Sequence, residues 1–469
     1  MLMTIFCGII VGLISLGLLI SPWPYLAPLV IFAIFGLRAL YRHPDWGLLG
    51  LAALVPFEGL FRNNLLSGAK LIGISLIAIL LLQLLLRQLP QTNLRGNLWR
   101  PLCLFLFCML MSTLFTENLL FSLNNWRELL IGMTLFGITL LAGRQINPFL
   151  LCRLIALGVV ATALTALFSI KHQVEGRAVG LLQDPNYFAL LIAIAFPLAM
   201  LSALHARQTL TRLFWGGVSL LLLIGMVRTD SRSGLFVLIL TCAIGLWQQR
   251  DKLRRLRPRH LGFVMLAIAI LTPVSLMLMP PEYVARVKSI ANLQSGIIAS
   301  QDTSLGRRAS YLVVGAQMMR DNPLLGSGPG TFPLRYAQSG YAKLFSGLEG
   351  QIDLLRRAHN TYLEIFSEMG IPAGLLFVSL LLLGLRNFER ARQIWRVDER
   401  KKSDLAAHLG LSLLALSLFL MFLSLPNHKY LWLLLALSCV LRQQAEAAPA
   451  KDAIAPAAPR VAKGECFST

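Results

Sequence analysis

Long apolar runs alternate with short polar connections along almost the whole chain. Many of the runs approach the roughly 20 apolar residues that an α-helix needs to cross the hydrocarbon of a bilayer. They are continuous and rich in Leu, Ile and Ala, so they lack the alternating pattern of an outer-membrane barrel. The pattern therefore predicts an all-α polytopic membrane protein with about 12–14 transmembrane helices. The expected spans are residues 4–20, 24–41, 45–61, 69–87, 101–116, 127–143, 148–169, 186–205, 211–228, 232–247, 261–279, 361–386, 405–425 and 428–442.

One polar interruption, from Pro280 to Ala358, is much longer than the others. It is rich in Arg, Gly and Asp, so it cannot lie in hydrocarbon and must lie at or outside one face of the membrane. Within it, the amphipathic run Leu312–Met319 is typical of a short helix. We therefore expect four regions: transmembrane helices in 1–279, a long, partly helical loop in 280–358, C-terminal transmembrane helices in 359–442, and a disordered tail in 443–469.

Charge gives the expected orientation in the membrane. The 469 residues are 56% hydrophobic and 14% charged, with a net charge of +21. Such a charge would suggest nucleic acid in a soluble protein, but here the basic residues gather in short loops, Gln248–His260 and Arg386–Lys402 above all, as cytoplasmic loops do. Counting spans from these loops places Pro280–Ala358 outside, together with Lys171–Pro185 and Thr229–Arg232, and both termini in the cytoplasm. We expect membrane lipids as surroundings and no nucleic-acid partner.

Cysteines and acidic residues give no sign of a metal or a cofactor. None of the seven cysteines falls in the long loop, so the sequence predicts neither a disulfide framework nor a thiolate metal site. The acidic residues expected outside, Glu175, Asp184, Asp302 and Glu364, are scattered. A diphosphate bound there would have to be neutralised by guanidinium groups, whose forked donors match phosphate oxygens.

Arg232 lies between two apolar runs with only a few polar residues separating them. A charged side chain this close to hydrocarbon is costly unless it meets an anion or a water-filled cavity, so it indicates a functional site. The alternative is an ion pair with Asp230, or a side chain that reaches the lipid headgroups.

Arg307 precedes the amphipathic run of the long loop. A helix capped by Asp302, Thr303 or Ser304 would hold Arg307 in its first turn, where free N–H groups and the helix dipole attract anions. Arg itself is unfavourable at that end of a helix, and a bound phosphate would resolve the conflict. Arg308 could have the same role, and the alternative for both is a solvated surface arginine.

Two further stretches of the sequence belong to the same expected side. Arg177 could join the anion site, while Asp184 and Pro185 are typical of an N-cap and of the first residue of a helix. The run Asn322–Phe332 contains three glycines but lacks the Lys of a P-loop, so we interpret it as a tight, irregular turn that shapes the site.

His359 ends the long loop and opens a helical stretch, with Asn360 and Glu364 close by in sequence. A neutral imidazole, whose unperturbed pKa is about 6.5, can take a proton from a hydroxyl at neutral pH. A histidine that caps a helix at the membrane interface is the alternative. Because three arginines are expected on the same side, we favour a general base.

In their order and spacing these motifs resemble the O-antigen ligase and polymerase superfamily of bacterial envelope glycosyltransferases. The resemblance covers about residues 176–376. At the position after the Arg307 motif where the family often has Trp, this chain has Tyr311. The segments that carry the resemblance are Arg177–Phe188, Ser231–Gly234, Arg307–Tyr311, Asn322–Phe332 and His359–Pro372.

The resemblance implies an inverting, metal-independent and cofactor-free transfer of O-antigen polysaccharide from undecaprenyl diphosphate to a sugar of the lipid A core, at the periplasmic face of the bacterial inner membrane. His359 would deprotonate the acceptor hydroxyl, and Arg232 and Arg307 would hold the leaving diphosphate. Further expected site residues are Arg308 and Arg177 for the diphosphate, and Tyr311, Asn360, Asp184 and Asn186 in support. The alternatives are a polymerase of the same superfamily, a protein O-oligosaccharyltransferase, a transporter of anionic solutes and a polysaccharide-binding scaffold.

Overall fold

The structure is a computed structural model that describes residues 26–61, 68–89, 96–174, 176–182, 184–250, 303–349 and 354–454, with a few isolated positions before residue 26. The expected spans 4–20 and 261–279 therefore lie almost wholly outside the described residues, as does the chain from 455 onward.

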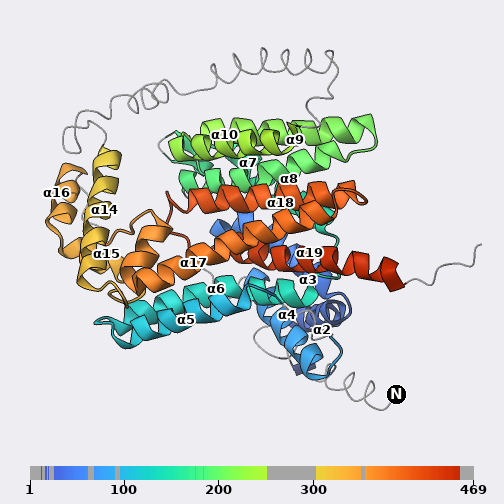
Figure 1. The fold of residues 1–469 in the computed structure, drawn as a ribbon, viewed down its shortest axis with the longest axis horizontal. Coiled ribbons are helices and arrows are strands. Elements are labelled where there is room, and N and C mark those ends of the chain that lie inside the picture. Colours follow the sequence, from blue (N-terminus) through green and yellow to red (C-terminus); the bar gives the residue numbers. More distant parts are fainter. Residues whose placement is uncertain are drawn as a thin grey trace, which may run out of the picture.

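The described chain is almost entirely helical, which confirms the all-α fold class. Figure 1 shows the long helices packed side by side, with α14, α15 and α16 together at one end of the bundle. The α-helices are α2 (Leu26–Arg42), α3 (Pro44–Leu54), α4 (Gly68–Leu85), α5 (Trp99–Leu114), α6 (Leu119–Ala142), α7 (Pro148–Phe168), α8 (Pro185–Leu204), α9 (Thr209–Arg228), α10 (Arg232–Gln248), α14 (Thr303–Asp321), α15 (Phe332–Gln338), α16 (Gly340–Glu349), α17 (Thr361–Ile394), α18 (Arg400–Phe419) and α19 (Lys429–Ile454). Two short 3-10 helices, η1 (Val55–Phe61) and η3 (Ile170–His172), and an antiparallel pair of two-residue strands, β1 (Gln173–Val174) and β2 (Arg177–Ala178), complete the described elements.

The apolar runs predicted helix ends well where a capping residue and a proline mark them. Helix α7 begins at Pro148 after Asn147, whose side chain accepts hydrogen bonds from the N–H groups of Phe149 and Leu150. The expected span 45–61 is different, because it divides into α3 and η1. Pro56 lies at this division, where its ring and missing N–H interrupt the α-helical hydrogen bonds.

The outer surface of the bundle is apolar, as expected for a protein in lipid. Within the described residues, α7, α8, α9 and α17 are long and apolar enough to cross a membrane, and α4, α5 and α10 are apolar but shorter. Phe214 and Phe236, on α9 and α10, are more than half exposed. Isolated exposed apolar residues are ordinary in soluble proteins, but whole helix faces of them mark a membrane-facing surface. The chain is therefore a membrane protein.

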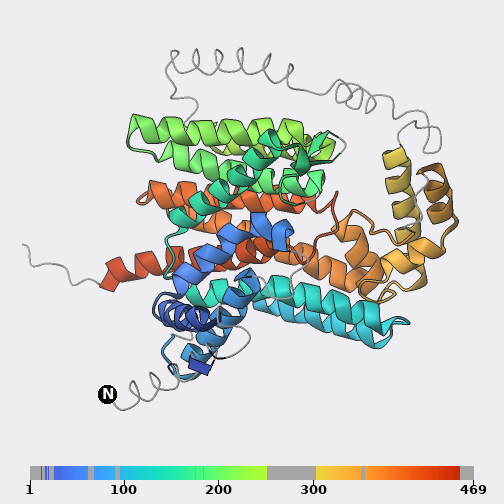
Figure 2. The same cartoon turned by 180° about the vertical axis from the view of Figure 1, so that it is seen from behind.

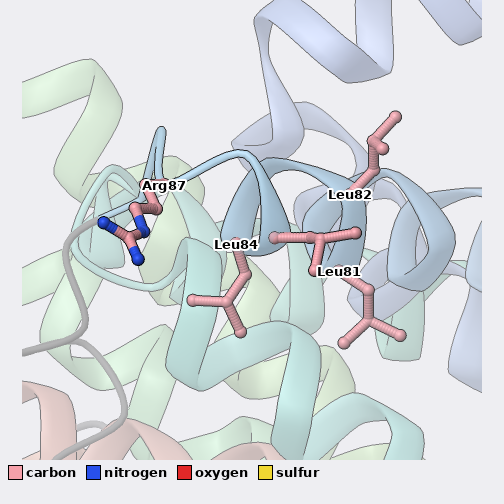
Figure 3. A pocket seen from close by; sticks show the side chains of 5 residues that line it. Leu81, Leu82, Leu84 and Arg87 are labelled. Carbon is pink, nitrogen blue, oxygen red and sulfur yellow. The ribbon is translucent and has the colours of Figure 1, made fainter.

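A shallow cavity on α4 illustrates this surface (Figure 3). Its volume is about 740 Å³, and it is lined by Leu81, Leu82, Leu84, Leu85 and Arg87. The leucines follow one another along the helix, and Arg87 lies just beyond its last turn. An apolar helix face that ends in a long basic side chain suits the boundary between hydrocarbon and headgroups.

Helix α17 is broken at Gly370, whose backbone (φ 85°, ψ 168°) is not helical. The groups that the break leaves without helical partners bond to the glycine-rich turn of the long loop. The N–H of Ile371 donates to the carbonyl of Pro323 at 2.8 Å, and the N–H of Gly328 donates to the carbonyl of Glu368 at 2.8 Å. Irregular backbone near a membrane persists only where protein or water satisfies it. The turn and the break therefore stabilise each other.

The C-terminal helix corrects one expected boundary. Helix α19 runs from Lys429 to Ile454, so residues 443–454, which we expected in a disordered tail, are helical. Alanines favour helix here, and Arg442 donates to Glu446 one turn further on, at 2.9 Å.

Candidate active site

Several helix ends meet at the end of the bundle that carries α14–α16 (Figure 1 and Figure 2). Among them are the C-terminal ends of α7 and α9 and the N-terminal ends of α8, α10 and α17. Two stretches that are far apart in sequence, 176–186 and 229–233, are joined here by hydrogen bonds, and Asp184 of the first stretch acts electrostatically on His359 at the end of the long loop. The N-terminal ends of three helices at one place supply partial positive charge, which favours an anion.

Arg177 holds the turn between α9 and α10. Its Nε donates to the carbonyl oxygen of Thr229 at 3.0 Å, and one of its terminal nitrogens donates to the carbonyl oxygen of Asp230 at 3.3 Å. These carbonyls follow the last turn of α9, where unsatisfied acceptors and the negative end of the helix dipole attract a cation. Arg177 therefore contacts backbone and fixes the turn that leads to Arg232.

Asp184 caps α8 as its sequence predicts. Its side chain accepts hydrogen bonds from the N–H groups of Asn186 at 2.7 Å and Tyr187 at 2.9 Å, and Pro185 is the first residue of the helix. The amide oxygen of Asn186 in turn accepts from the hydroxyl of Ser231 at 2.8 Å. The start of α8 is thereby joined to the start of α10.

Arg232 is the first residue of α10 and is half-buried. Ser231 caps the helix by accepting from the N–H of Gly234 at 3.2 Å. Asp230, just before the cap, is buried and has the left-handed φ of 50°, which is uncommon for a residue other than glycine. Such a conformation persists only where the surroundings impose it, so the position of Arg232 is closely defined.

His359 has the same left-handed conformation, with φ 49°. Its ring is half-buried and stacks on the ring of Tyr311, with 6.1 Å between the ring centroids. The cap of α17 is Asn360, whose side chain accepts from the N–H of Leu363 at 3.1 Å. Asn360 thus fills the capping role that was the alternative for His359, and the imidazole is left within electrostatic reach of Arg308 on α14.

Glu364 fixes the peptide that leads to His359. Its carboxylate is buried, accepts from the N–H of Ala358 at 2.9 Å and pairs with Arg357 at 3.1 Å. The Glu364 carboxylate raises the pKa of Arg357, which keeps that guanidinium charged. The ion pair therefore acts on the backbone immediately before the histidine.

Burial and neighbouring charge keep the imidazole of His359 neutral. Burial lowers its pKa below the ordinary value of 6.5, and the positive charge of Arg308 lowers the pKa further. Asp184 and Glu364 act in the opposite direction on the same pKa, but the net shift is downward. At neutral pH the ring therefore has a lone pair that can accept a proton.

Helix α14 carries Arg307 and Arg308 against an aromatic cluster. We had expected Arg307 in the first turn of this helix. The helix is described from Thr303, so Arg307 lies in its second turn. Burial lowers the pKa of Arg307, and the charge of Arg356 lowers it further. Tyr311 is buried one turn along and contacts Tyr336 edge-on, with 4.7 Å between the ring centroids. Tyr311 therefore holds the helix in place and stacks on His359.

The glycine-rich turn depends on a residue that sequence reasoning missed. Gly326, Gly328 and Gly330 all have positive φ, between 68° and 107°, which confirms the tight irregular turn. The buried carboxylate of Glu368 accepts from the N–H groups of Gly330 at 2.7 Å and Phe332 at 2.9 Å. The signal available in the sequence was an acidic residue one turn after Glu364, on an otherwise apolar helix face.

Sequence reasoning also missed Arg356 and Arg357 as residues of the candidate site. Arg356 acts on the pKa of both Arg307 and Tyr311, and Arg357 pairs with Glu364. Two consecutive arginines directly before the Ala-His pair were the sequence signal. Across the described part of the chain, no three His, Cys, Asp or Glu side chains come together as metal ligands.

A comparison with protein families finds one match. Residues 217–378 fit the model of a family described as O-antigen ligase. This segment, about a third of the chain, supports a relationship to the O-antigen ligase and polymerase superfamily. A search of curated proteins finds no match.

The O-antigen ligase segment contains most of the site. Arg232, Arg307, Arg308 and His359 all lie inside 217–378, together with the glycine-rich turn and the break in α17. Arg177, Asp184 and Asn186 lie before it. Arg177 and Asn186 are joined to it by hydrogen bonds to the turn between α9 and α10, and Asp184 caps the helix that carries Asn186. Members of this superfamily are glycosyltransferase-like enzymes that use lipid-linked glycans, so the match agrees with a site of cations around one neutral imidazole.

Proposed function

We propose that the protein is an O-antigen ligase: an inverting, metal-independent glycosyltransferase that moves O-antigen polysaccharide from undecaprenyl diphosphate onto the lipid A core. The observation that carries this proposal is the neutral imidazole of His359, held in a left-handed backbone conformation beside Arg308. The match to the O-antigen ligase family supports the class of reaction.

The proposed reaction needs a base, an acceptor and a stabilised leaving group. A ring nitrogen of His359 takes the proton of the acceptor hydroxyl as its oxygen attacks the anomeric carbon of the donor sugar. The new C–O bond forms as the bond from that carbon to the diphosphate oxygen breaks, and the electron pair leaves with the diphosphate. Attack from the side opposite the leaving group inverts the anomeric centre. The imidazolium then releases its proton to water.

Arginines take the place of a metal ion in this proposal. Arg232 comes from the start of α10, and Arg307 and Arg308 come from α14, so the diphosphate would be held between two separate elements. Guanidinium groups bind phosphate oxygens in pairs, and the positive end of the α10 dipole adds to their effect. Arg177, which donates to the backbone at Thr229 and Asp230, would position Arg232 without contacting the diphosphate.

We place the site at the periplasmic face of the inner membrane, with both termini in the cytoplasm. The support is the positive charge of the Arg386–Lys402 connection, which lies at the opposite end of α17 from His359. Lipid-linked donor and lipid A acceptor would both reach the site from the membrane.

A deletion strain tests the function directly. We expect it to lack capped lipopolysaccharide and to accumulate full-length polymer on undecaprenyl diphosphate, because polymerisation precedes the blocked transfer. Gel analysis of lipopolysaccharide and mass spectrometry of extracted lipid-linked glycans measure both. Accumulation of single repeat units instead would identify a polymerase, and normal lipopolysaccharide would exclude both activities.

The pH at which the transfer rate falls on the acid side should depend on the charges around His359. Transfer needs the neutral ring, so the rate should fall as pH drops through the lowered pKa of His359. Arg308→Gln removes a charge that lowers this pKa, so the fall should move to higher pH. Asp184→Asn removes a charge that raises this pKa while preserving the α8 cap, so the fall should move to lower pH.

Initial rates with purified donor and acceptor, measured from about pH 4 to about pH 8, give the shift of this fall in rate, because histidines titrate in roughly this range. The two variants serve as controls for each other, because general damage would lower the rates of both without moving the profile in opposite directions. Identical profiles for both variants and the unmodified protein would remove His359 from the role of base.

A further inference from the structure

A second basic site lies at the opposite end of the same helices. Helix α8 ends at Leu204 and α9 begins at Thr209 there, next to the starts of α7 and α18. Between these ends is a cavity of about 380 Å³. Its lining comes from all four helix ends, and it shares no residue with the candidate active site.

The cavity is lined by cations and has no acidic lining residue among the described ones. Arg153, Arg207 and Lys401 line it together with His205. His205 is paired with Asp404, with 3.2 Å between Nε2 and the carboxylate oxygen, and its ring contacts Phe149 edge-on. Asp404 is therefore engaged with the histidine at the edge of the site, and the excess charge of the cavity is positive.

Two groups in the cavity have unused donor capacity. The Nε of Arg153 is buried and has no hydrogen-bond partner among the described residues. Helix α9 starts after Gln208, which lines the cavity and makes no side-chain cap. The first N–H groups of a helix lack partners within it, and the helix dipole makes this end attractive to anions. Arg153, whose Nε has no partner in the described part of the chain, and an uncapped helix start thus line one cavity.

The surroundings of the cavity are apolar. Leu150 on α7 and Leu210, Leu213 and Phe214 on α9 are exposed within a few residues of the lining, three of them by more than half. A small soluble anion would gain nothing from these side chains. A lipid would place its phosphate in the basic cavity and its acyl chains along the apolar faces of α7 and α9.

We propose that this cavity binds the phosphate headgroup of an anionic phospholipid. The site lies at the end of the bundle opposite the candidate active site, so it is independent of the proposed transfer reaction. Arg153 and the start of α9 would contact the phosphate, and the exposed side chains of Arg207 and Lys401 would close around it.

Lipid binding to the full-length protein in detergent tests this. Native mass spectrometry would count bound short-chain phosphatidylglycerol, with phosphatidylcholine and inorganic phosphate as separate probes. We expect one tightly bound phosphatidylglycerol, weaker phosphatidylcholine and no competition by inorganic phosphate at the same concentration. In the double variant Arg207→Gln/Lys401→Gln, phosphatidylglycerol affinity should fall at least about tenfold, since each cation near an anionic surface contributes about fivefold.

Arg400→Gln is the matched control, because Arg400 is exposed, adjacent to Lys401 and outside the lining. Its phosphatidylglycerol affinity should fall by much less than that of the double variant, because Arg400 does not line the cavity. Arg153→Gln should weaken binding as the double variant does. Equal loss in Arg400→Gln and the double variant would reduce the effect to general surface charge and overturn the site. Binding of inorganic phosphate in place of phosphatidylglycerol would overturn the assignment to a lipid.

Discussion

Replacing His359 with Asn is expected to abolish glycan transfer while the protein still folds. Asn is one of the few residues other than glycine that readily adopt the left-handed conformation found at this position, so the backbone has no reason to change. Asn cannot take the proton of the acceptor sugar's hydroxyl, as a neutral imidazole can. The rate should therefore fall by roughly a hundred- to ten-thousand-fold.

The loss is measured as capped lipopolysaccharide in cells and as transfer by purified protein. His172→Asn is the control, because His172 is a half-buried histidine of η3, near the same end of the bundle, with no part in the proposed reaction. Both variants should be present in the membrane at the level of the unmodified protein. A His359→Asn protein with normal transfer would exclude the imidazole as base.

Arg232→Lys should remove most of the activity although it keeps the charge. A lysine ammonium cannot offer the planar pair of donors with which a guanidinium binds two phosphate oxygens. Loss of one such contact to a leaving group typically lowers turnover by about a hundredfold or more. The measurement is single-turnover transfer from undecaprenyl-linked donor at saturating acceptor.

Arg228→Lys provides the matched comparison for Arg232. It changes the same residue type one turn earlier in the chain, at the end of α9, and should leave transfer within a few-fold of normal. If Arg232→Lys is as active as Arg228→Lys, then a positive charge is sufficient at residue 232. A bidentate contact to the diphosphate would then be ruled out.

Sequence patterns predicted most of the fold because the relevant signals are local. The start of α8 follows from an apolar run preceded by Asp184 and Pro185, whose capping geometry needs only neighbouring backbone. The same is true of α7 and Asn147. The division of the span at Pro56 and the continuation of α19 beyond residue 442 have local causes too, a proline and a run of alanines, but a search for apolar runs alone does not contain these signals.

The sequence predicted that the stretches around Arg177 and Arg232 come together, but not the contacts between them. Loop counting brought Arg177 to the right end of the bundle, but its hydrogen bonds to Thr229 and Asp230 depend on how α9 ends in space. Glu368 was missed for a similar reason. Its two partners, the N–H groups of Gly330 and Phe332, lie 36 or more residues away, and backbone donors leave no trace in side-chain identity.

The interruption of α17 at Gly370 also constrains how the nascent protein matures. The part of the helix after it, residues 371–394, is long enough to cross about 30 Å of hydrocarbon without the residues before it. The N–H of its first residue, Ile371, donates to the carbonyl of Pro323, which is synthesised earlier. This span therefore completes its hydrogen bonding only when the segment that contains Pro323 has arrived beside it. Insertion of this part of α17 and assembly of the candidate site would then be a single event in biogenesis.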